Sequence, residues 1–462
     1  MPFGSFILPP RDAKRRPSRS WLAACSVLCL NLMSGPVAAW TSQQPSVSSP
    51  YVLDRVFMLV RHGIRAPLAH EAAAADLAAN PWPVWDVPSS QLTAHGQKNV
   101  SLSGVYFRQW FISQHVLPKR GCPPAGWLRL SANTDQRTID SGQLLGAALL
   151  PGCDIALEHQ PRGSDDPIYR PVESGVVPFD AARAIETIQQ ETGGLDHLVA
   201  QHRAEFMTLA RVLGCEERCP FHSMPSSLAP STDGRSLRLD GPINLASGTA
   251  EVLLLEYVQG FPMKEVGWGR LTPARLAQLS RLHALLFDVY ANSAYMAPHS
   301  AAQLLHELMT VMTAKDSSRV PKLSIFVGSD TQIAAMSRVL GVHFHLPGYG
   351  RDDPSPGSAM VIEVWRRRNS DERMLRVDYV GQSPDQLRHA TPLSNRTPPL
   401  WQTLHSSRCP SSDHRGMCPL PIMTAALRRQ RVAPTHAAAL PNGSPHVLPH
   451  PVPTSTSKPL QR

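Results

Sequence analysis

A short apolar run that ends in a polar cluster occurs three times along the chain. The runs and the clusters after them are Val56–Val60 before Arg61–Gly63, Leu128–Ser131 before Asn133–Asp135, and Leu323–Val327 before Gly328–Asp330. Continuous apolar runs of this length are typical of strands that are buried on both faces of a parallel sheet. Helical patterns follow the clusters, and Pro67 suits the first turn of the helix that follows the first cluster. The sequence therefore predicts an α/β sheet with crossover helices.

Between about residues 175 and 310 the pattern becomes mainly helical. The segments with helical periodicity are Ala181–Gln190, Leu195–Leu213, Ala250–Val258 and Thr272–Tyr290. Few strand signals lie between them, so we expect residues 175–310 to form an α-helical domain inserted between residues 40–174 and 311–430 of the α/β domain. Val361–Trp365 and Met374–Val380 then predict an antiparallel pair of strands.

The two ends of the chain carry different signals. Residues 1–39 have basic residues, then the apolar run Trp21–Met33 and small residues before Trp40, which predict a cleaved signal peptide. The apolar run is too short to anchor the protein in a bilayer. We therefore expect export to the periplasm or out of the cell, without a membrane anchor. Residues 431–462 are rich in proline, alanine and serine, which predicts a disordered basic tail.

The formal net charge of +9 is no indication of nucleic-acid binding. The predicted signal peptide carries a net charge of +4, and the residues from Arg428 onward carry +5. Residues 40–427 are therefore close to neutral, so any positive potential in the folded part must be local.

Six cysteines remain after removal of the predicted signal peptide. They are Cys122, Cys153, Cys215, Cys219, Cys409 and Cys418. An even number of cysteines in an exported chain favours disulfides over metal ligation. Several connectivities are open on this evidence, and pairing between sequence neighbours is the simplest of them.

Arg61, His62 and Arg65 place two guanidiniums and an imidazole within five residues at the end of a predicted strand. Guanidinium groups offer forked donors that match phosphate oxygens. An imidazole held between them can attack phosphorus when one ring nitrogen is unprotonated. Because the carboxyl ends of neighbouring strands meet at one crevice of an open α/β sheet, Arg137 and Asp330 are expected to join this cluster. The five residues predict a phosphoryl-transfer site that needs no metal or cofactor.

In these residues the chain resembles the histidine acid phosphatases, and among them the bacterial periplasmic glucose-1-phosphatases and phytases. The resembling segments are Arg61–Pro67, Asp135–Thr138, Gln259–Pro262, Gly267–Gly269, Phe326–Thr331, Val364–Arg367, Cys409 and Gly416–Pro419. They occur in the family's order between about residues 50 and 427. The resemblance implies a three-layer α/β sandwich around a central mixed sheet, of the phosphoglycerate-mutase type, with an inserted α-helical domain.

The resemblance also implies roles for individual residues. His62 would form a phosphohistidine intermediate, and Asp330 would donate a proton to the leaving group. The phosphate group of the substrate would be bound by Arg61, Arg65 and Arg137. The ligand would be a small phosphomonoester, no metal or cofactor would be required, and disulfides would join the neighbouring cysteines.

Ser329 departs from the family pattern, which has a histidine before the aspartate. That histidine donates a hydrogen bond to the bound phosphate, and Ser329 would replace it with a shorter, uncharged donor. Gln332 also replaces a usual asparagine. Loss of a charge-assisted donor from a preorganised site lowers turnover by roughly 10²–10³-fold. The alternative to an active phosphatase is therefore a weakly active or non-catalytic protein that binds phosphorylated ligands.

Two kinds of substrate fit the resemblance. Ala69 stands where the phytases have a lysine that helps to bind phytate, whereas Gly63 is the phytase-type residue. Glu251 matches an acidic position that lines the family's pocket, and the alternative for this residue is a solvated helix face. We expect small sugar phosphates such as glucose 1-phosphate, with phytate as the close alternative.

Overall fold

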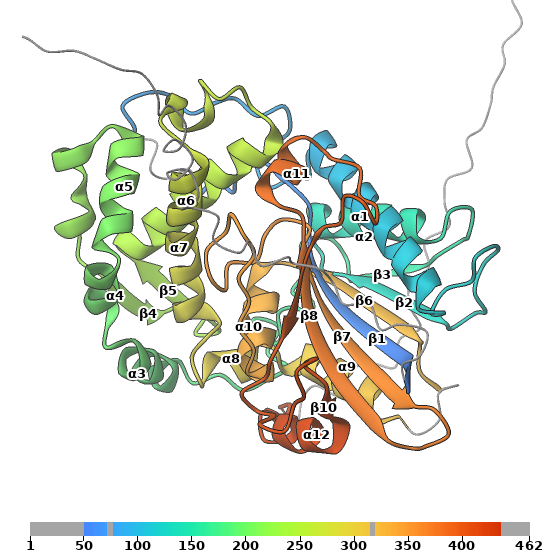
Figure 1. Ribbon diagram of the computed structural model, residues 1–462. Coiled ribbons are helices and arrows are strands. Elements are labelled where there is room, and N and C mark those ends of the chain that lie inside the picture. The colour runs from blue at the N-terminus through green and yellow to red at the C-terminus, as the bar shows by residue number, and fades with distance from the viewer. Residues whose placement is uncertain (1–49, 72–76, 315–318, 436–462) are drawn as a thin grey trace, which may run out of the picture. The chain divides into compact units, whose positions relative to one another are not determined.

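The computed structural model describes residues 50–71, 77–314 and 319–435. The predicted signal peptide and the tail from residue 436 lie outside the described residues. An eight-stranded sheet has the strand order β10-β8-β7-β1-β6-β2-β3, in which β9 pairs with β8 (Figure 1). Its strands are β1 (Tyr51–Arg61), β2 (Leu128–Ala132), β3 (Leu157–Glu158), β6 (Leu323–Gly328), β7 (Ala359–Arg367), β8 (Arg373–Gly381), β9 (Leu400–Leu404) and β10 (Cys418–Pro419).

Helices flank this sheet and fill the stretch between β3 and β6. The α-helices are α1 (Ala94–Ser113), α2 (Gln136–Leu149), α3 (Ala181–Thr192), α4 (Leu195–Gln201), α5 (Arg203–Leu213), α6 (Pro242–Gln259), α7 (Pro273–Tyr290), α8 (Met296–Ser300), α9 (Ala302–Thr313), α10 (Asp330–Leu340), α11 (Pro384–Arg388) and α12 (Leu420–Arg428). Three short 3₁₀ helices are η2 (Glu216–Arg218), η3 (Pro220–His222) and η4 (Val266–Gly269).

The sheet is mixed, as predicted. β1, β6, β2 and β3 pair in parallel, whereas β7, β8, β9 and β10 pair antiparallel. The antiparallel pair expected near residues 361–380 is therefore confirmed. Val327 of β6 pairs with Val60 of β1 and with Ala132 of β2. The carboxyl ends of these three central strands consequently lie side by side.

Alternate residues of the strands face two separate cores. On one face, Met58 and Ile325 join a core that includes Phe107 of α1 and side chains of α2. On the other face, Leu59 and Phe326 join a core that includes side chains of α9, α10 and α12. The sheet therefore lies between two helical layers, which is the predicted three-layer arrangement.

The mainly helical stretch differs from its prediction in two details. The helix expected over residues 195–213 is two helices, because His202 leaves the helical backbone conformation between α4 and α5. The sequence prediction also missed a hairpin, formed by β4 (Ser227–Pro230) and β5 (Leu237–Asp240). α9 begins within this stretch, at Ala302, and packs against both β1 and α12.

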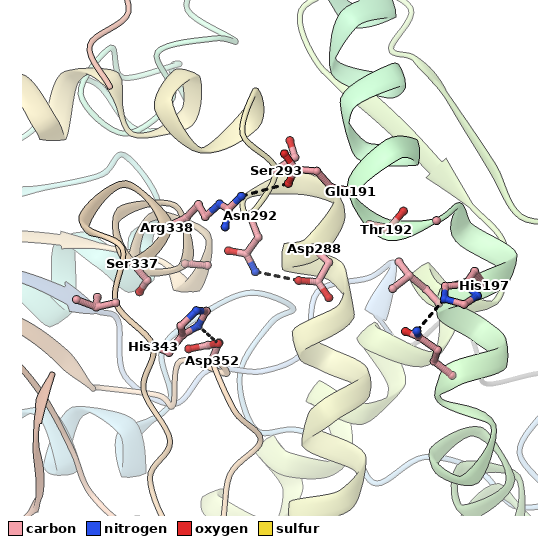
Figure 2. Close-up of a pocket in the computed structure, with 15 residues that line it drawn as sticks. Glu191, Thr192, His197, Asp288, Asn292, Ser293, Ser337, Arg338, His343 and Asp352 are labelled. Atoms are coloured by element: carbon pink, nitrogen blue, oxygen red, sulfur yellow. Dashed lines mark hydrogen bonds and ion pairs between the residues drawn. The ribbon is translucent and has the colours of Figure 1, made fainter. Parts of the chain in front are cut away.

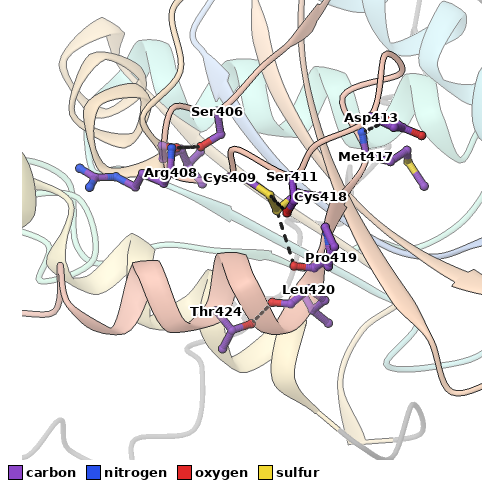
Figure 3. Close-up of a disulfide and its surroundings, with 11 residues drawn as sticks. Ser406, Arg408, Cys409, Ser411, Asp413, Met417, Cys418, Pro419, Leu420 and Thr424 are labelled. Carbon is purple, nitrogen blue, oxygen red and sulfur yellow. Dashed lines mark hydrogen bonds between the residues drawn. A yellow bond between two sulfur atoms is a disulfide. The ribbon is translucent and has the colours of Figure 1, made fainter.

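Three disulfides join the cysteines in the expected neighbour pairing. They are Cys122–Cys153, Cys215–Cys219 and Cys409–Cys418. The last of these lies where the chain enters β10 and α12 (Figure 3). No helix among the described residues is long and apolar enough to cross a lipid bilayer.

The expectation of disorder from residue 431 onward is wrong for residues 431–435. The Thr435 backbone N–H donates to the carbonyl of Val176 (2.9 Å), and its hydroxyl donates to the carbonyl of Gly175 (3.0 Å). Val432 packs against a small apolar cluster that contains Val172 and Val177. These contacts hold the start of the tail on the body of the protein.

Candidate active site

The predicted site residues meet at the carboxyl ends of three parallel strands. β1 ends at Arg61 directly before His62, and β6 is followed by Ser329 and Asp330. The backbone N–H of His62 donates to the carbonyl of Gly328 at 3.0 Å, which ties the end of β1 to that of β6. α2 and α10 both begin at this edge, so two helix N-termini, which favour anions, lie at the same edge of the sheet.

The His62 imidazole is buried and held by its own backbone. Its Nδ1 lies 2.8 Å from the carbonyl oxygen of Gly63, which favours a proton on Nδ1 and a lone pair on Nε2. Burial lowers the pKa of His62 well below its usual value, and the charges of Arg137, Arg61 and Arg65 lower it further. The ring is therefore a neutral imidazole whose far nitrogen is available to an electrophile.

Gly63 has no room for a side chain. A Cβ at this position would lie 2.6 Å from a Val100 methyl group and 3.1 Å from the carbonyl oxygen of Gly96. Its backbone N–H also donates to a side chain of α2, the Ser141 hydroxyl, at 3.1 Å. The glycine lets α1 and α2 approach the loop after β1 and so fixes the position of His62.

Arg61 is fully buried between two carboxylates. Its Nη2 lies 2.5 Å from Glu251 Oε1 and 2.7 Å from Asp330 Oδ2. Nη1 donates to the carbonyl of Pro354. This guanidinium links β1, α6 and the start of α10.

Arg65 is held by a carboxylate that the sequence analysis did not identify. Glu71 accepts two parallel hydrogen bonds from Arg65, at 2.7 Å and 2.6 Å. The prediction that a helix begins near Pro67 is wrong. Residues 65 and 66 instead pair with the segment before α1, since Arg65 forms a β-bridge with Leu92. Among the described residues, the next α-helix starts at Ala94 and is capped by Thr93.

Arg137 lies at the start of α2, next to β2. Its Nη2 lies 3.1 Å from Asp135 Oδ2, and the same oxygen lies 3.1 Å from Nη2 of Arg170. Burial lowers the pKa of Arg137, but a guanidinium remains charged at any physiological pH. Arg61, Arg65 and Arg137 each bury an Nε that has no hydrogen-bond partner among the described residues. An oxyanion between them would satisfy these donors.

Asp330 is the first residue of α10 and faces Arg61. Burial acts to raise the pKa of this carboxyl group, but the charges of Arg61 and His283 outweigh it and hold the pKa below its usual range. Oδ1 accepts a hydrogen bond from the backbone N–H of Thr331 at 2.8 Å. In the ligand-free arrangement this residue is therefore an ionised carboxylate.

Ser329 does not offer a free donor to the site. Its hydroxyl donates to Gln332 Oε1 at 2.7 Å, and the same oxygen accepts the Ser329 backbone N–H at 2.8 Å. Gln332 Nε2 in turn donates to the carbonyl of Tyr169 at 2.9 Å. The expectation that the Ser329 hydroxyl serves as a phosphate donor is thus opposed by a local hydrogen bond that uses its only proton.

Glu251 is fully buried, so the alternative of a solvated helix face is wrong. Glu251 also lies close to a histidine. His283 Nδ1 is 3.7 Å from Glu251 Oε2 and 2.6 Å from Asp353 Oδ1. Burial acts to lower the pKa of His283, but the two carboxylates raise it to about 9. The sequence analysis missed His283 and Asp353. A lone histidine in the apolar segment Leu282–Leu285 was the available signal.

One set of these side chains has the composition of a metal site. Ligand atoms of Glu251, His283 and Asp330 all lie within 4.8 Å of one another. Arg61 Nη2 already contacts both carboxylates, and His283 Nδ1 contacts Asp353. A divalent cation would have to displace the guanidinium, so the arrangement fits an ion-pair network better than metal ligation.

A pocket of about 350 Å³ adjoins the cluster. Arg137, Ser329 and Thr331 lie on its wall, together with the apolar side chains of Phe287 and Met296. A second pocket, of about 470 Å³, lies among α3, α4, α7 and α10, away from these residues (Figure 2). Its polar side chains are paired with one another, among them His343 with Asp352 at 2.6 Å.

Comparison with known proteins agrees with the fold. The sequence matches the histidine phosphatase superfamily (branch 2) over residues 52–205. The phytase AppA of Escherichia coli is 31% identical over 420 residues, which cover 86% of this chain and 95% of that protein. A glucose-1-phosphatase of Salmonella typhimurium is 30% identical over 408 residues, which cover 86% and 96%.

A solved structure is similarly close. The phytase of Hafnia alvei in complex with tartrate has a TM-score of 0.77 and 32% identity, and the match covers 83% of this chain and 98% of that one. The sequence and the structure therefore agree on relatives that share nearly their whole length with this protein. The chain belongs to branch 2 of the histidine phosphatase superfamily, a family of phosphoric monoester hydrolases.

Proposed function

We propose that this protein is an exported acid phosphatase that hydrolyses phosphomonoesters through a phosphohistidine at His62. The observation that carries the proposal is the grouping of three buried arginines, each with an unpaired Nε donor, around a neutral imidazole. Such a group of donors stabilises charge on a transferring phosphoryl group. Arg61, Arg65 and Arg137 are the proposed phosphate ligands.

In the first step, Nε2 of His62 attacks the phosphorus atom and forms an N–P bond. The bond between phosphorus and the ester oxygen breaks, and this oxygen takes a proton from Asp330 as the alcohol leaves. In the second step, water attacks the phosphohistidine and gives a proton to the Asp330 carboxylate. Inorganic phosphate then leaves, and His62 and Asp330 return to their starting states.

Asp330 needs a proton for the first step, although it is ionised in the ligand-free site. Arg61 is the main favourable charge beside it. A phosphate dianion bound to Arg61 would offset that positive charge and raise the pKa of Asp330. Substrate binding thus supplies the condition under which Asp330 can act as an acid, and acidic pH assists it.

For the alcohol part of the substrate we propose a small sugar with a single phosphate. The charged residues on the wall of the adjoining pocket are two arginines and two acids, namely Arg137, Arg170, Asp135 and Glu173. A wall with balanced charge suits a neutral polyol better than a ligand with many phosphates. The named relatives include a glucose-1-phosphatase and two phytases, so phytate is the competing substrate.

A phosphate-binding protein with little or no turnover is the second candidate. Ser329 favours it, because its hydroxyl proton is engaged by Gln332 and the site has no further charged donor at that place. We also propose that residues 175–310 form an inserted domain. Residues 1–39, as a signal peptide, would direct the protein to the periplasm or out of the cell.

The test is a hydrolysis assay of the purified chain without residues 1–39, at acidic pH. Glucose 1-phosphate, phytate and p-nitrophenyl phosphate are compared by release of inorganic phosphate. We expect hydrolysis of all three, with the highest kcat/KM for glucose 1-phosphate. Binding of glucose 1-phosphate without any phosphate release would favour the second candidate, and higher kcat/KM for phytate would overturn the proposed substrate.

A further inference from the structure

A pocket lined by four arginines lies at the far end of α10 from Asp330. Its volume is about 390 Å³. The arginines come from the last turn of α10, the loop before Cys409 and the segment after α12; they are Arg338, Arg408, Arg429 and Arg431. Gln430 and Val432 line the same side of the pocket as the arginines. No acidic residue is among the described residues that line it.

Specific contacts hold two of its walls in place. Arg408 Nε donates to the carbonyl of Val339 at 2.6 Å, and its Nη2 donates to the carbonyl of Arg338 at 3.1 Å. Arg408 directly precedes Cys409, whose disulfide to Cys418 anchors this loop (Figure 3). The loop is therefore fixed both to the end of α10 and to the chain before α12.

The third wall is the start of the C-terminal tail. Val432 packs against Val172 and Val177, and Thr435 is hydrogen-bonded to the backbone of Gly175 and Val176. These contacts position Arg431 beside the end of α12. The arginines consequently belong to a preformed pocket and not to a freely moving chain end.

Most of the positive charge in this pocket has no counter-charge. Arg338 pairs with Glu191 at 3.3 Å (Figure 2). Arg408, Arg429 and Arg431 have no carboxylate partner within 4 Å among the described residues. Burial lowers the pKa of Arg408, and the charges of Arg338 and Arg429 lower it further. Gathering like charges in this way costs free energy, which a bound anion would offset.

We propose that this pocket binds a phosphate group, as inorganic phosphate or as a phosphomonoester, independently of the active site. Guanidinium groups bind phosphate oxygens through paired hydrogen bonds. Arg429 and Arg431 have their side chains free for such bonds. The volume of the pocket also accommodates a phosphate that carries a small organic group.

The test uses the chain without residues 1–39, carrying His62→Ala so that esters are not turned over. Inorganic phosphate and glucose 1-phosphate are titrated separately by isothermal titration calorimetry. Each titration is repeated after adding Arg429→Gln and Arg431→Gln. The matched control adds Arg203→Gln and Arg396→Gln, which remove two exposed arginines that do not line the pocket.

We expect two binding events with at least one ligand, of which one is weakened about tenfold or more by the pocket variant and not by the control. If the pocket variant loses a binding event for inorganic phosphate alone, the ligand is free phosphate. If it loses a binding event for glucose 1-phosphate alone, the ligand is a phosphate ester. Binding of both ligands that is the same in the pocket variant and in its background would overturn the proposal. Hydrolysis by the pocket variant with His62 restored should equal that of the unmodified protein.

Discussion

At the scale of single residues, the burial of charge sets the chemistry of the site. His62 is neutral because burial and three guanidiniums lower its pKa, so Nε2 keeps its lone pair at acidic pH, where an exposed histidine is protonated. The guanidiniums are in turn held by carboxylate side chains. Glu251, for example, forms an ion pair with Arg61. The proposed nucleophile and phosphate ligands therefore depend on the buried acidic side chains that hold the guanidiniums.

Glu71 provides a test of this dependence. Glu71→Gln would replace the paired, charge-assisted hydrogen bonds on Arg65 with one neutral acceptor. We expect kcat/KM to fall roughly 10–100-fold, since hydrogen bonds to charged groups contribute about 1.5–3 kcal/mol. Glu158→Gln, which breaks the Glu158–Arg129 pair outside the cluster, is the control and should leave kcat/KM unchanged. Equal effects of both variants would contradict a positioning role for Glu71.

Ser329 gives the second prediction at this scale. Because its hydroxyl proton is donated to Gln332, Ser329→Ala should change kcat by less than about threefold. Ser329→His would add a charged donor and should raise kcat by roughly 10²-fold. Steady-state kinetics with p-nitrophenyl phosphate measure both effects. A loss of about 10²-fold in Ser329→Ala would show instead that the hydroxyl binds the phosphate.

The sequence identified the side chains that follow strand ends, because that position is readable from the apolar runs. Arg61, His62 and Asp330 meet where the strand pattern placed them. Glu71, His283 and Asp353 were missed, since none of them directly follows a strand. Glu71 lies six residues after Arg65, whereas His283 and Asp353 come from parts of the chain far from Arg61. No local pattern marks a residue whose partner is fixed only by tertiary packing.

At the scale of secondary-structure elements, the antiparallel half of the sheet contains an unusual charge arrangement. On the β7–β8 hairpin, Glu363 and Asp378 are both buried and share one guanidinium, Arg376, at 2.9 Å and 3.0 Å. Trp365 Nε1 donates to Glu363 at 2.7 Å. Burial and the charge of Asp378 raise the pKa of Glu363, whereas Arg376 lowers it, and the net result is a pKa of about 7.

This hairpin should make the fold more stable at acidic pH. Because the pKa of Glu363 is higher in the folded state than its usual 4.5, the folded state keeps a proton that the unfolded chain loses. The contribution is complete below about pH 4.5 and is lost as the pH rises to about 7, by roughly 3 kcal/mol. Urea unfolding at several pH values should show a flatter profile for Glu363→Gln than for the unmodified protein.

The control for this prediction lies on the same hairpin. Glu372 is exposed, and hydrogen bonds from Tyr51 and Arg367 lower the pKa of its carboxyl group. Glu372→Gln should therefore keep the loss of stability between pH 4.5 and 7. An unchanged pH profile in Glu363→Gln would contradict the role assigned to the buried carboxyl group.

The elements that the sequence missed share a physical cause. The β4–β5 hairpin turns at Asp233-Gly234, a turn signal that is followed by the short apolar–polar alternation Leu237–Asp240 but has no such alternation before it. Pro67 is compatible with a helix start, but the Arg65–Leu92 bridge takes the chain elsewhere. Central strands were predictable because burial on both faces leaves a continuous apolar run, whereas short surface elements follow from tertiary contacts.

At the scale of the whole described chain, the disulfides join cysteines at different separations in the sequence. Cys122–Cys153 spans a separation of 31 residues, and Cys215–Cys219 spans 4. Loop-closure entropy predicts stabilisation of about 3–4 kcal/mol for the first and about 2 kcal/mol for the second. Paired Cys→Ser variants, compared by urea unfolding, should show the larger loss for Cys122→Ser with Cys153→Ser. The reverse order would contradict the entropic account.

The most direct test of the proposed mechanism is to trap the covalent intermediate. The chain without residues 1–39 is mixed rapidly with p-nitrophenyl phosphate, quenched at alkaline pH where phosphohistidine survives, and digested for mass spectrometry. We predict a phosphoryl group on Nε2 of His62, absent from the same peptide of His62→Ala, which should also lose hydrolysis by on the order of 10⁴-fold or more. A phosphoryl group on another residue, or full hydrolysis by His62→Ala, would contradict the proposed mechanism.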